Sequence, residues 1–200
     1  MLTRSFIRSD MEDITLPTKP LESYLETLKN SIRNIPDFPK PGIQFKDIST
    51  LLNDKNNLLI TTLCIERYLK DNGIAFNKVA GIESRGFIFG SCIAMDSLEP
   101  FVIVRKPGKL PVETISQEYQ LEYGTDKIEV AYDAFKPGDE VLLVDDLLAT
   151  GGTLEAAAKL VEKCGAKVAG IAVVIELEGL GGRERLSKYP LVSLVQYPEV

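Results

Sequence analysis

The segment Val141-Leu-Leu-Val-Asp-Asp-Leu-Leu-Ala-Thr-Gly-Gly-Thr153 decides the fold of this 200-residue chain. The continuous apolar centre of Glu140–Val144 is typical of a parallel strand that is buried on both faces of a sheet. Asp145 and Asp146 follow where this strand is expected to end, and a loop of small residues leads directly into an Ala-rich helix expected at Thr153–Cys164. The segment therefore predicts a strand, a short loop and a helix in immediate succession.

The loop between this strand and helix has the features of a phosphate site. Ligands of open α/β sheets bind at the carboxyl ends of the strands, and a helix start offers unpaired N–H groups and the positive end of the helix dipole. Gly151 and Gly152 let the backbone approach a phosphate closely, while Thr150 and Thr153 add hydroxyl donors. The two acids before the loop can accept hydrogen bonds from vicinal ribose hydroxyls. The whole pattern favours a sugar-phosphate site over an ordinary turn.

Helices and strands alternate on both sides of this segment. The expected helices are Thr18–Ile35, Asp54–Lys70 and Gly86–Ser97, and the expected strands are Lys78–Ile82, Phe101–Arg105, Gln117–Tyr123, Lys127–Tyr132 and Lys167–Glu176. Gly124-Thr125-Asp126 is expected to be the turn of a hairpin between the third and fourth of these strands. The alternation predicts an α/β domain with a mostly parallel central sheet flanked by helices.

We expect one folded domain over residues 18–200, preceded by a flexible N-terminal extension over residues 1–17. Arg4 and Arg8 faintly resemble a transit peptide, but acids at positions 10, 12 and 13 follow at once and favour a disordered extension. No stretch approaches the ~20 apolar residues that a membrane span requires. We therefore expect no membrane partner.

Composition excludes several classes of reaction centre. The chain has no histidine, which removes Ser-His-Asp and Cys-His centres and imidazole-based zinc sites. Its three separated cysteines, Cys64, Cys92 and Cys164, cannot form a four-thiolate zinc site and indicate reduced thiols in the cytoplasm. The net charge of −6 argues against a nucleic-acid partner, although a small anion needs only a local basic pocket.

A rival phosphate motif fails on its spacing. Gly81-Ile-Glu-Ser-Arg-Gly86 has the glycine spacing of a P-loop, but Phe87 and Ile88 stand where Lys and Ser or Thr are required. No G-x-G-x-x-G occurs either. ATPase and dinucleotide-binding interpretations are therefore excluded.

The chain resembles a known family at several separate blocks. Val144–Thr153 matches the phosphoribosyl-pyrophosphate signature of type I phosphoribosyltransferases, and the chain from Leu21 to its end is similar to the adenine phosphoribosyltransferases. The further matching blocks are Pro36–Ser49, Glu83–Gly90, Val104–Pro111 and Leu121–Gly124. The resemblance implies a type I phosphoribosyltransferase fold with a small base-binding hood and a mobile catalytic loop.

The resemblance also assigns roles to individual residues. It implies that the loop Ala149, Thr150, Gly151, Gly152 and Thr153 holds the 5′-phosphate, and that Asp145 and Asp146 hold the ribose hydroxyls near the reacting carbon. Glu83, Ser84 and Arg85 correspond to the loop that receives pyrophosphate, with a cis Glu83–Ser84 peptide and with Arg85 as the fixed cation. Arg105, Lys106 and Lys109 would open the mobile catalytic loop. Glu122 matches the proposed acid–base carboxylate.

Adenine recognition would fall on Gln44, Phe45 and Lys46. Phe45 can stack on the purine, and backbone groups beside it can bind the edge of the base. Gln44 stands where the family often has an aliphatic residue, and Lys46 stands where Arg is usual. A Gln44 side chain that faced the base could tolerate an oxo group and loosen the specificity.

The implied reaction joins adenine N9 to the phosphoribosyl group of phosphoribosyl pyrophosphate, and it gives AMP and pyrophosphate through a cation-like ribosyl transition state. The implied cofactor is Mg²⁺, held mainly by substrate and water without a dedicated protein ligand. The implied assembly is a homodimer. Two alternatives remain open: the same fold acting on hypoxanthine, guanine or xanthine, and a regulatory binding protein that retains the phosphoribosyl site.

Overall fold

The computed structural model describes residues 20–120 and 124–198. At its centre lies a five-stranded sheet in the order β4-β3-β7-β8-β9, and every neighbouring pair of strands is parallel. The strands are β3 (Lys78–Ile82), β4 (Phe101–Val104), β7 (Glu140–Leu148), β8 (Lys167–Leu177) and β9 (Leu191–Tyr197). The predicted parallel α/β sheet is confirmed.

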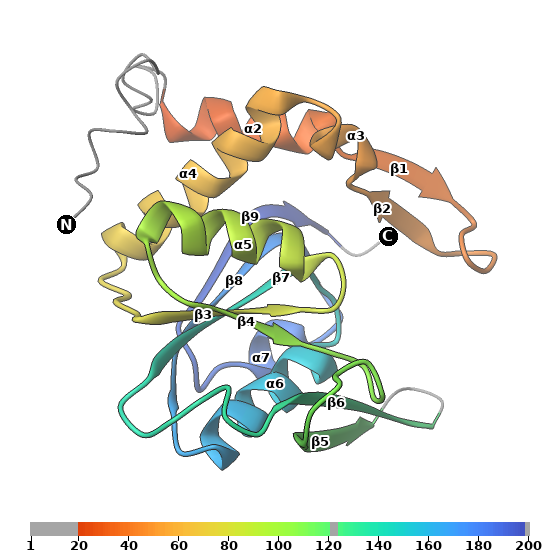
Figure 1. Cartoon of the computed structure of the whole chain (residues 1–200). Helices are drawn as coiled ribbons and strands as arrows, with labels where there is room; N and C mark the ends of the chain where they lie inside the picture. Colours follow the sequence, from red (N-terminus) through yellow and green to blue (C-terminus); the bar gives the residue numbers. More distant parts are fainter. Residues whose placement is uncertain (1–19, 121–123, 199–200) are drawn as a thin grey trace.

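Helices cover both faces of this sheet (Figure 1). One face carries α2 (Leu21–Ser31), α4 (Lys55–Asp71) and α5 (Gly86–Ser97), with the short α3 (Ser49–Leu52) beside them. The opposite face carries α6 (Gly152–Lys163) and the short α7 (Gly182–Arg185). The helices predicted at 54–70, 86–97 and 153–164 agree with α4, α5 and α6 to within one residue at each end.

Strand β7 divides two hydrophobic cores. Leu142 and Val144 are fully buried in the core beneath α2, α4 and α5, whereas Val141 and Leu143 are fully buried in the core against α6. Consecutive residues of a strand point to opposite faces, so a strand between two helical layers must be apolar at every position. This requirement explains the continuous apolar run of the deciding segment.

Two antiparallel hairpins extend from the edges of the domain (Figure 1): β1 (Arg33–Pro36) with β2 (Gln44–Asp47), and β5 (Thr114–Gln120) with β6 (Thr125–Ala131). The first was not predicted, and the helix expected to reach Ile35 ends at Ser31. Ile35 instead pairs with Phe45 across the hairpin. Prolines at positions 36, 39 and 41 confine this segment to a turn between extended strands, which overrides the helical spacing of its apolar residues.

Three further expectations need correction. Thr125 and Asp126 pair with Gln120 and Tyr119, so they belong to β6 and not to a turn. Strand β7 continues past Val144 to Leu148, because β8 keeps pairing with it beyond the two acids. Strand β9 was not predicted at all. Its seven residues follow Pro190 and pair in parallel with β8, a partner that local sequence cannot reveal.

None of the helices within residues 20–120 and 124–198 is long and apolar enough to cross a membrane. All three cysteines are unbridged. The predicted extension over residues 1–17 lies outside the described residues, so the expected domain boundary stays a prediction.

Candidate active site

The end of β7 and the start of α6 form one wall of a pocket of about 220 Å³. Its lining consists of Arg85 and the continuous run from Asp145 to Leu154. Gly151 has a φ of +76°, in the left-handed region where a side chain is disfavoured, and its carbonyl oxygen accepts the N–H of Glu155 at 2.9 Å. The structure thus brings all five predicted phosphate-loop residues together with both acids and one arginine.

The two acids of this pocket are held at an electrostatic cost. Asp146 is 3% exposed, and its Oδ2 lies 3.1 Å from Nη1 of Arg85 but has no hydrogen-bond partner within the described part of the chain. Burial raises the pKa of Asp145 well above its ordinary value, and the neighbouring Asp146 raises it further. Burial also raises the pKa of Asp146, although Arg85 opposes this shift. A buried carboxylate oxygen without a donor is suited to accept a hydrogen bond from a hydroxyl group of a bound sugar.

Close packing of α5 against β7 places Arg85 beside the acids. Gly86 begins α5, and a Cβ built on it would lie 2.5 Å from the carbonyl oxygen of Val144 and 3.1 Å from Cα of Asp145. Only glycine fits at this distance. The preceding Glu83–Ser84 peptide is cis, as the resemblance implied.

Glu83 joins the predicted pyrophosphate loop to the predicted catalytic loop. Its carboxylate accepts Nη2 and Nε of Arg105 at 3.1 and 3.2 Å and the backbone N–H of Lys106 at 2.8 Å. These hydrogen bonds lower the pKa of Glu83, and those from the Arg105 side chain have the largest effect. Nη1 of Arg105 also donates to the carbonyl oxygen of Lys109 at 3.3 Å. The Arg105 side chain therefore holds both loops in one arrangement.

Lys106 ties the same loop to the β5–β6 hairpin. Its Nζ forms an ion pair with Asp126 and donates to the Tyr119 hydroxyl at 2.9 Å. Among the six residues predicted for pyrophosphate and the catalytic loop, all of them described, only Arg85 lines the 220 Å³ pocket. Lys106 thus contacts Tyr119 and Asp126 of the hairpin, and the side chains of Arg105 and Lys109 also lie outside the pocket.

Phe45 lies next to the same arginine. The guanidinium carbon of Arg85 is 5.7 Å from the centroid of the Phe45 ring, and Phe38 packs edge-on against that ring at 5.1 Å. Because Arg85 also pairs with Asp146, it lies between the aromatic ring and the acids. The predicted base-stacking residue is therefore adjacent to the predicted ribose site.

Gln44 and Lys46 lie on the face of β2 that is opposite to Phe45, as residues at alternate positions of a strand must. The side-chain amide of Asn34 on β1 connects them: its Nδ2 donates to Oε1 of Gln44 at 2.7 Å, and its Oδ1 accepts Nζ of Lys46 at 2.9 Å. The Lys46 ammonium lies 4.3 Å from the Tyr197 ring centroid, and burial lowers its pKa. Gln44 and Lys46, the two residues that depart from the family pattern, thus bind Asn34 on the face of β2 opposite to Phe45.

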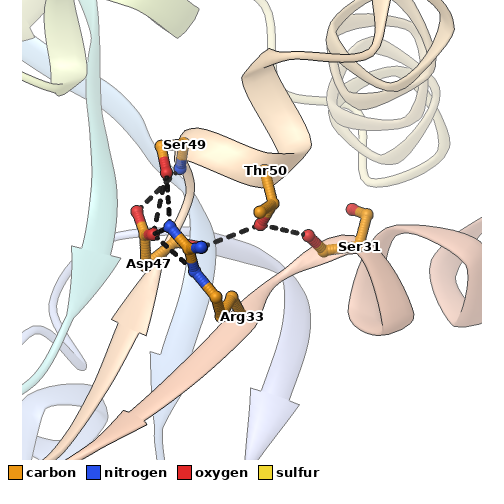
Figure 2. A network of polar contacts seen from close by, with 5 residues as sticks. All are labelled: Ser31, Arg33, Asp47, Ser49 and Thr50. Atoms are coloured by element: carbon orange, nitrogen blue, oxygen red, sulfur yellow. Dashed lines mark hydrogen bonds and ion pairs between the residues drawn. The ribbon is translucent and has the colours of Figure 1, made fainter.

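A polar network at the base of the hairpin connects it to the helices (Figure 2). Asp47 accepts Nε of Arg33 at 3.0 Å and the N–H of Ser49 at 2.9 Å, and Thr50 donates to the carbonyl oxygen of Ser31 at 2.6 Å. The hydrogen bonds from Arg33 and Ser49, of which the one from Arg33 has the largest effect, lower the pKa of Asp47 to about 2. The hairpin is therefore attached to the start of α3 and the end of α2.

Some residues could not be placed, and others were missed. Glu122, the predicted acid–base residue, lies outside the described residues. Within residues 20–120 and 124–198 there is no cluster of three or more His, Cys, Asp or Glu that could hold a metal ion. Sequence reasoning missed Asn34 and Tyr197, and it missed the glycine-rich segment 179–182, in which Gly182 packs against the predicted phosphate loop. Only the last has a local signal, its three glycines.

Comparison with known proteins agrees with this geometry. The family model of the phosphoribosyl transferase domain matches residues 49–196. An adenine phosphoribosyltransferase from Escherichia coli O157:H7 is 56% identical over 177 residues, which cover 87% of this chain and 95% of the relative. Enzymes of this family use a metal ion.

Two solved structures are similar over most of the chain. The adenine phosphoribosyltransferase from Thermoanaerobacter pseudethanolicus has a TM-score of 0.84 and 48% identity, and the alignment covers 86% of this chain and 99% of that one. The enzyme from Saccharomyces cerevisiae, crystallised with adenine and an imino-altritol bisphosphate, has a TM-score of 0.83 and 35% identity over 87% and 99% of the two chains. In sequence, in fold and in the arrangement of its pocket, the chain belongs to the adenine phosphoribosyltransferase family of the type I phosphoribosyltransferases.

Proposed function

We propose that this enzyme transfers the phosphoribosyl group of phosphoribosyl pyrophosphate to N9 of adenine, forming AMP and pyrophosphate. The observation that carries the proposal is the junction of β7 and α6, where the half-buried Asp145 and the buried Asp146 adjoin a glycine loop at a helix start. Arg85 connects this junction to the ring of Phe45. The proposed phosphate, ribose and base sites therefore follow one another in the order in which AMP carries these groups.

Each part of the pocket has a distinct task in the proposed reaction. Backbone N–H groups at the start of α6 bind the 5′-phosphate, because they are unpaired and lie at the positive end of the helix dipole. Asp145 and Asp146 accept the ribose hydroxyls and stabilise positive charge that develops on the ring. Arg85 then releases Asp146 and binds the departing pyrophosphate, since its side chain is 40% exposed and its guanidinium matches phosphate oxygens in shape.

The metal ion of the proposed reaction is Mg²⁺. The donors at the pocket are carboxylate oxygens, which suit a hard cation that keeps most of its waters. Asp145 and Asp146 would receive hydrogen bonds from those waters while substrate oxygens bind the ion. When bound, Mg²⁺ neutralises charge on the pyrophosphate leaving group. Glu122, whose predicted role rests on the resemblance alone, would exchange a proton with the purine ring.

Adenine, and not an oxo purine, is the proposed base. Gln44 bonds to Asn34 on the face of β2 opposite to Phe45, which leaves the backbone to bind the edge of the base. A backbone carbonyl can accept the exocyclic amine of adenine, and it repels the oxo group of hypoxanthine or guanine. The curated and structural relatives at 35–56% identity, all adenine phosphoribosyltransferases, support the same base.

We also propose a homodimer in the cytoplasm. Three large apolar side chains remain exposed on α5, just after it, and on the edge strand β4: Met95 (73%), Leu98 (69%) and Ile103 (38%). A second copy that packs on α5 would cover them. Three unbridged cysteines support a reducing compartment.

A base-competition assay tests the proposal. The purified chain is supplied with phosphoribosyl pyrophosphate, Mg²⁺ and an equimolar mixture of adenine, hypoxanthine, guanine and xanthine, and the nucleotides are separated by chromatography. AMP should account for nearly all of the product, and a chelator should abolish its formation. Predominant formation of IMP, GMP or XMP would show that the base is misassigned. Binding of phosphoribosyl pyrophosphate without turnover of any base would favour a regulatory protein.

A further inference from the structure

The short helix α7 lies directly against the phosphate loop. Gly182 begins α7 and is buried, and a Cβ built on it would lie 2.1 Å from the carbonyl oxygen of Ala149 and 2.8 Å from Cδ1 of Leu148. Neither separation can accommodate a carbon atom, and the nearer obstacle is backbone. A side chain at position 182 therefore fits only if the loop backbone moves.

The contact is reciprocal. A Cβ on Gly151 would lie 3.1 Å from the carbonyl oxygen of Gly182 and 3.2 Å from its Cα. Two glycines, thirty-one positions apart along the chain, thus face each other with no side chain between them. One belongs to the predicted phosphate loop, and the other lies outside every block on which the family resemblance rests.

An ion pair holds α7 in place. Nε of Arg183 donates to Oε1 of Glu176 at 2.7 Å, and Nη2 of Arg183 bonds to the other oxygen of the same carboxylate. Ser193 on β9 donates to this carboxylate at 2.6 Å and accepts Nη2 of Arg183 at 3.0 Å. Glu176 is 4% exposed, and Leu186 after α7 is fully buried. The support beneath the phosphate loop is therefore attached to the end of β8 and to Ser193 within β9.

We propose that Gly182 is a positioning residue for the 5′-phosphate of the substrate, acting through the backbone of Ala149 and Gly151. The phosphate is bound mainly by loop N–H groups, so its affinity depends on where the loop backbone lies. α7 sets that position because Gly182, which has no side chain, lets the backbone of α7 pack directly against the backbone of Ala149 and Gly151. This inference rests on the proposed function and adds a second, remote segment to its phosphate site.

The test compares Gly182→Ala with Gly181→Ala in the full chain. A Cβ at position 181 meets no atom within 4 Å, although its φ of +74° makes alanine unfavourable there. Gly181→Ala therefore controls for strain alone. Because displacement of a positioning group by about 1 Å can cost up to about 100-fold, Gly182→Ala should raise the KM for phosphoribosyl pyrophosphate and the Kd for AMP by roughly 10- to 100-fold. The KM for adenine at saturating phosphoribosyl pyrophosphate should stay within about 2-fold of wild type, since adenine carries no phosphate.

A second variant covers the case in which Gly182→Ala does not fold. Arg183→Gln adds no atom near the loop but loosens α7, and it should raise the KM for phosphoribosyl pyrophosphate by about 3-fold while the KM for adenine is unchanged. Its control is Lys188→Gln, which breaks the exposed Lys188–Glu162 pair on the following segment and should change neither constant.

Two results would overturn the inference. One is a wild-type KM for phosphoribosyl pyrophosphate in Gly182→Ala, or in Arg183→Gln if the first variant is insoluble. The other is an equal rise in both KM values, which would indicate general loosening of the domain. Failure of the proposed function would be seen separately, because the wild-type chain would then form no AMP.

Discussion

Asp145 and Asp146 show that a side chain placed for function can cost the fold stability. Asp146 is buried and Asp145 is half-buried, and burial raises the pKa of each. Arg85 compensates Asp146 only in part, because one carboxylate oxygen still lacks a hydrogen-bond donor among the described residues. Burial thus disfavours ionisation of both carboxylates, and hydrogen bonds from the hydroxyls of the proposed ribose would offset this cost.

Asp145→Asn should stabilise the unliganded protein at neutral pH. A raised pKa means that the folded state holds its proton more tightly than the unfolded state, so stability is greatest below the ordinary aspartate pKa and falls as pH rises through the raised pKa. Asparagine does not ionise and avoids this loss, and each kcal/mol regained should raise the Tm by about 2–4 °C. Calorimetry at pH 7 and pH 4 should show a Tm gain that shrinks at the lower pH. A gain of the same size at both pH values would contradict the assigned cause.

Asp146→Asn should lower turnover by about 100-fold or more with little loss of stability, because the carboxylate serves the sugar and its developing charge. The measurement is AMP formation at saturating substrates, with circular dichroism to confirm the fold. Arg67→Gln is a suitable control, since its ion pair with Asp71 lies on the exposed surface of α4. Turnover near the wild-type rate in Asp146→Asn would remove this residue from the proposed mechanism.

At the scale of elements, the β1–β2 hairpin presents one face of β2 to the site and the other to the rest of the domain, because consecutive residues of a strand point to opposite faces. Phe45 faces the site, while Gln44 and Lys46 face Asn34 and the end of β9. The Arg33–Asp47 network holds the base of the same hairpin (Figure 2). The hairpin can therefore vary on one face without altering the other.

Gln44→Val and Phe45→Leu test this separation as a matched pair. Gln44→Val should leave the ratio of adenine to hypoxanthine turnover within about 2-fold of wild type, because its side chain is bound on the far face. Phe45→Leu should raise the KM for adenine by roughly 5- to 150-fold, since stacking of a base on an aromatic ring contributes about 1–3 kcal/mol. Steady-state kinetics with each base measures both. A gain of hypoxanthine turnover in Gln44→Val would show that its side chain reaches the base.

At the scale of the whole molecule, α5 has apolar side chains on more than one side. It buries Phe89 and Ile93 in the core and leaves Met95 exposed. A helix that is apolar all round is typical of one covered by protein on more than one side. A second copy of the chain is the occupant that the resemblance implies.

Met95→Glu should therefore weaken the proposed dimer, because a carboxylate would be desolvated in the proposed contact. Sedimentation velocity over a range of concentrations should show more monomer than for wild type. Glu99→Gln, near the same helix end, is expected to leave the dimer intact. An unchanged dimer in Met95→Glu would place the interface elsewhere.

Removal of residues 1–17 should leave activity and dimerisation nearly intact. The prediction rests on sequence alone, since the acids at positions 10, 12 and 13 accompany no amphipathic pattern. Kinetics and sedimentation of the truncated chain measure it. A collapse of either property would assign the extension to the working enzyme.

The sequence by itself determined the layered, mostly parallel sheet and the glycine loop between β7 and α6. Both depend on neighbours in the chain: a strand apolar at every position, then two acids, then glycines at a helix start. Local order also indicated α4, α5 and α6, whose apolar spacing and flanking turn residues agree with the observed bounds. Such features require no knowledge of distant partners.

Only the tertiary structure decided which remote residues support the site. Strand β9, the Asn34 bridge on the hairpin and the contact of Gly182 with Ala149 join positions that are far apart or on separate strands. None of these contacts can be read from the spacing of residues along the chain, because each depends on how close two backbones or side chains come after packing. Distance between non-neighbours is a property of the folded chain, and that is why the pocket's acids could be predicted whereas its supports could not.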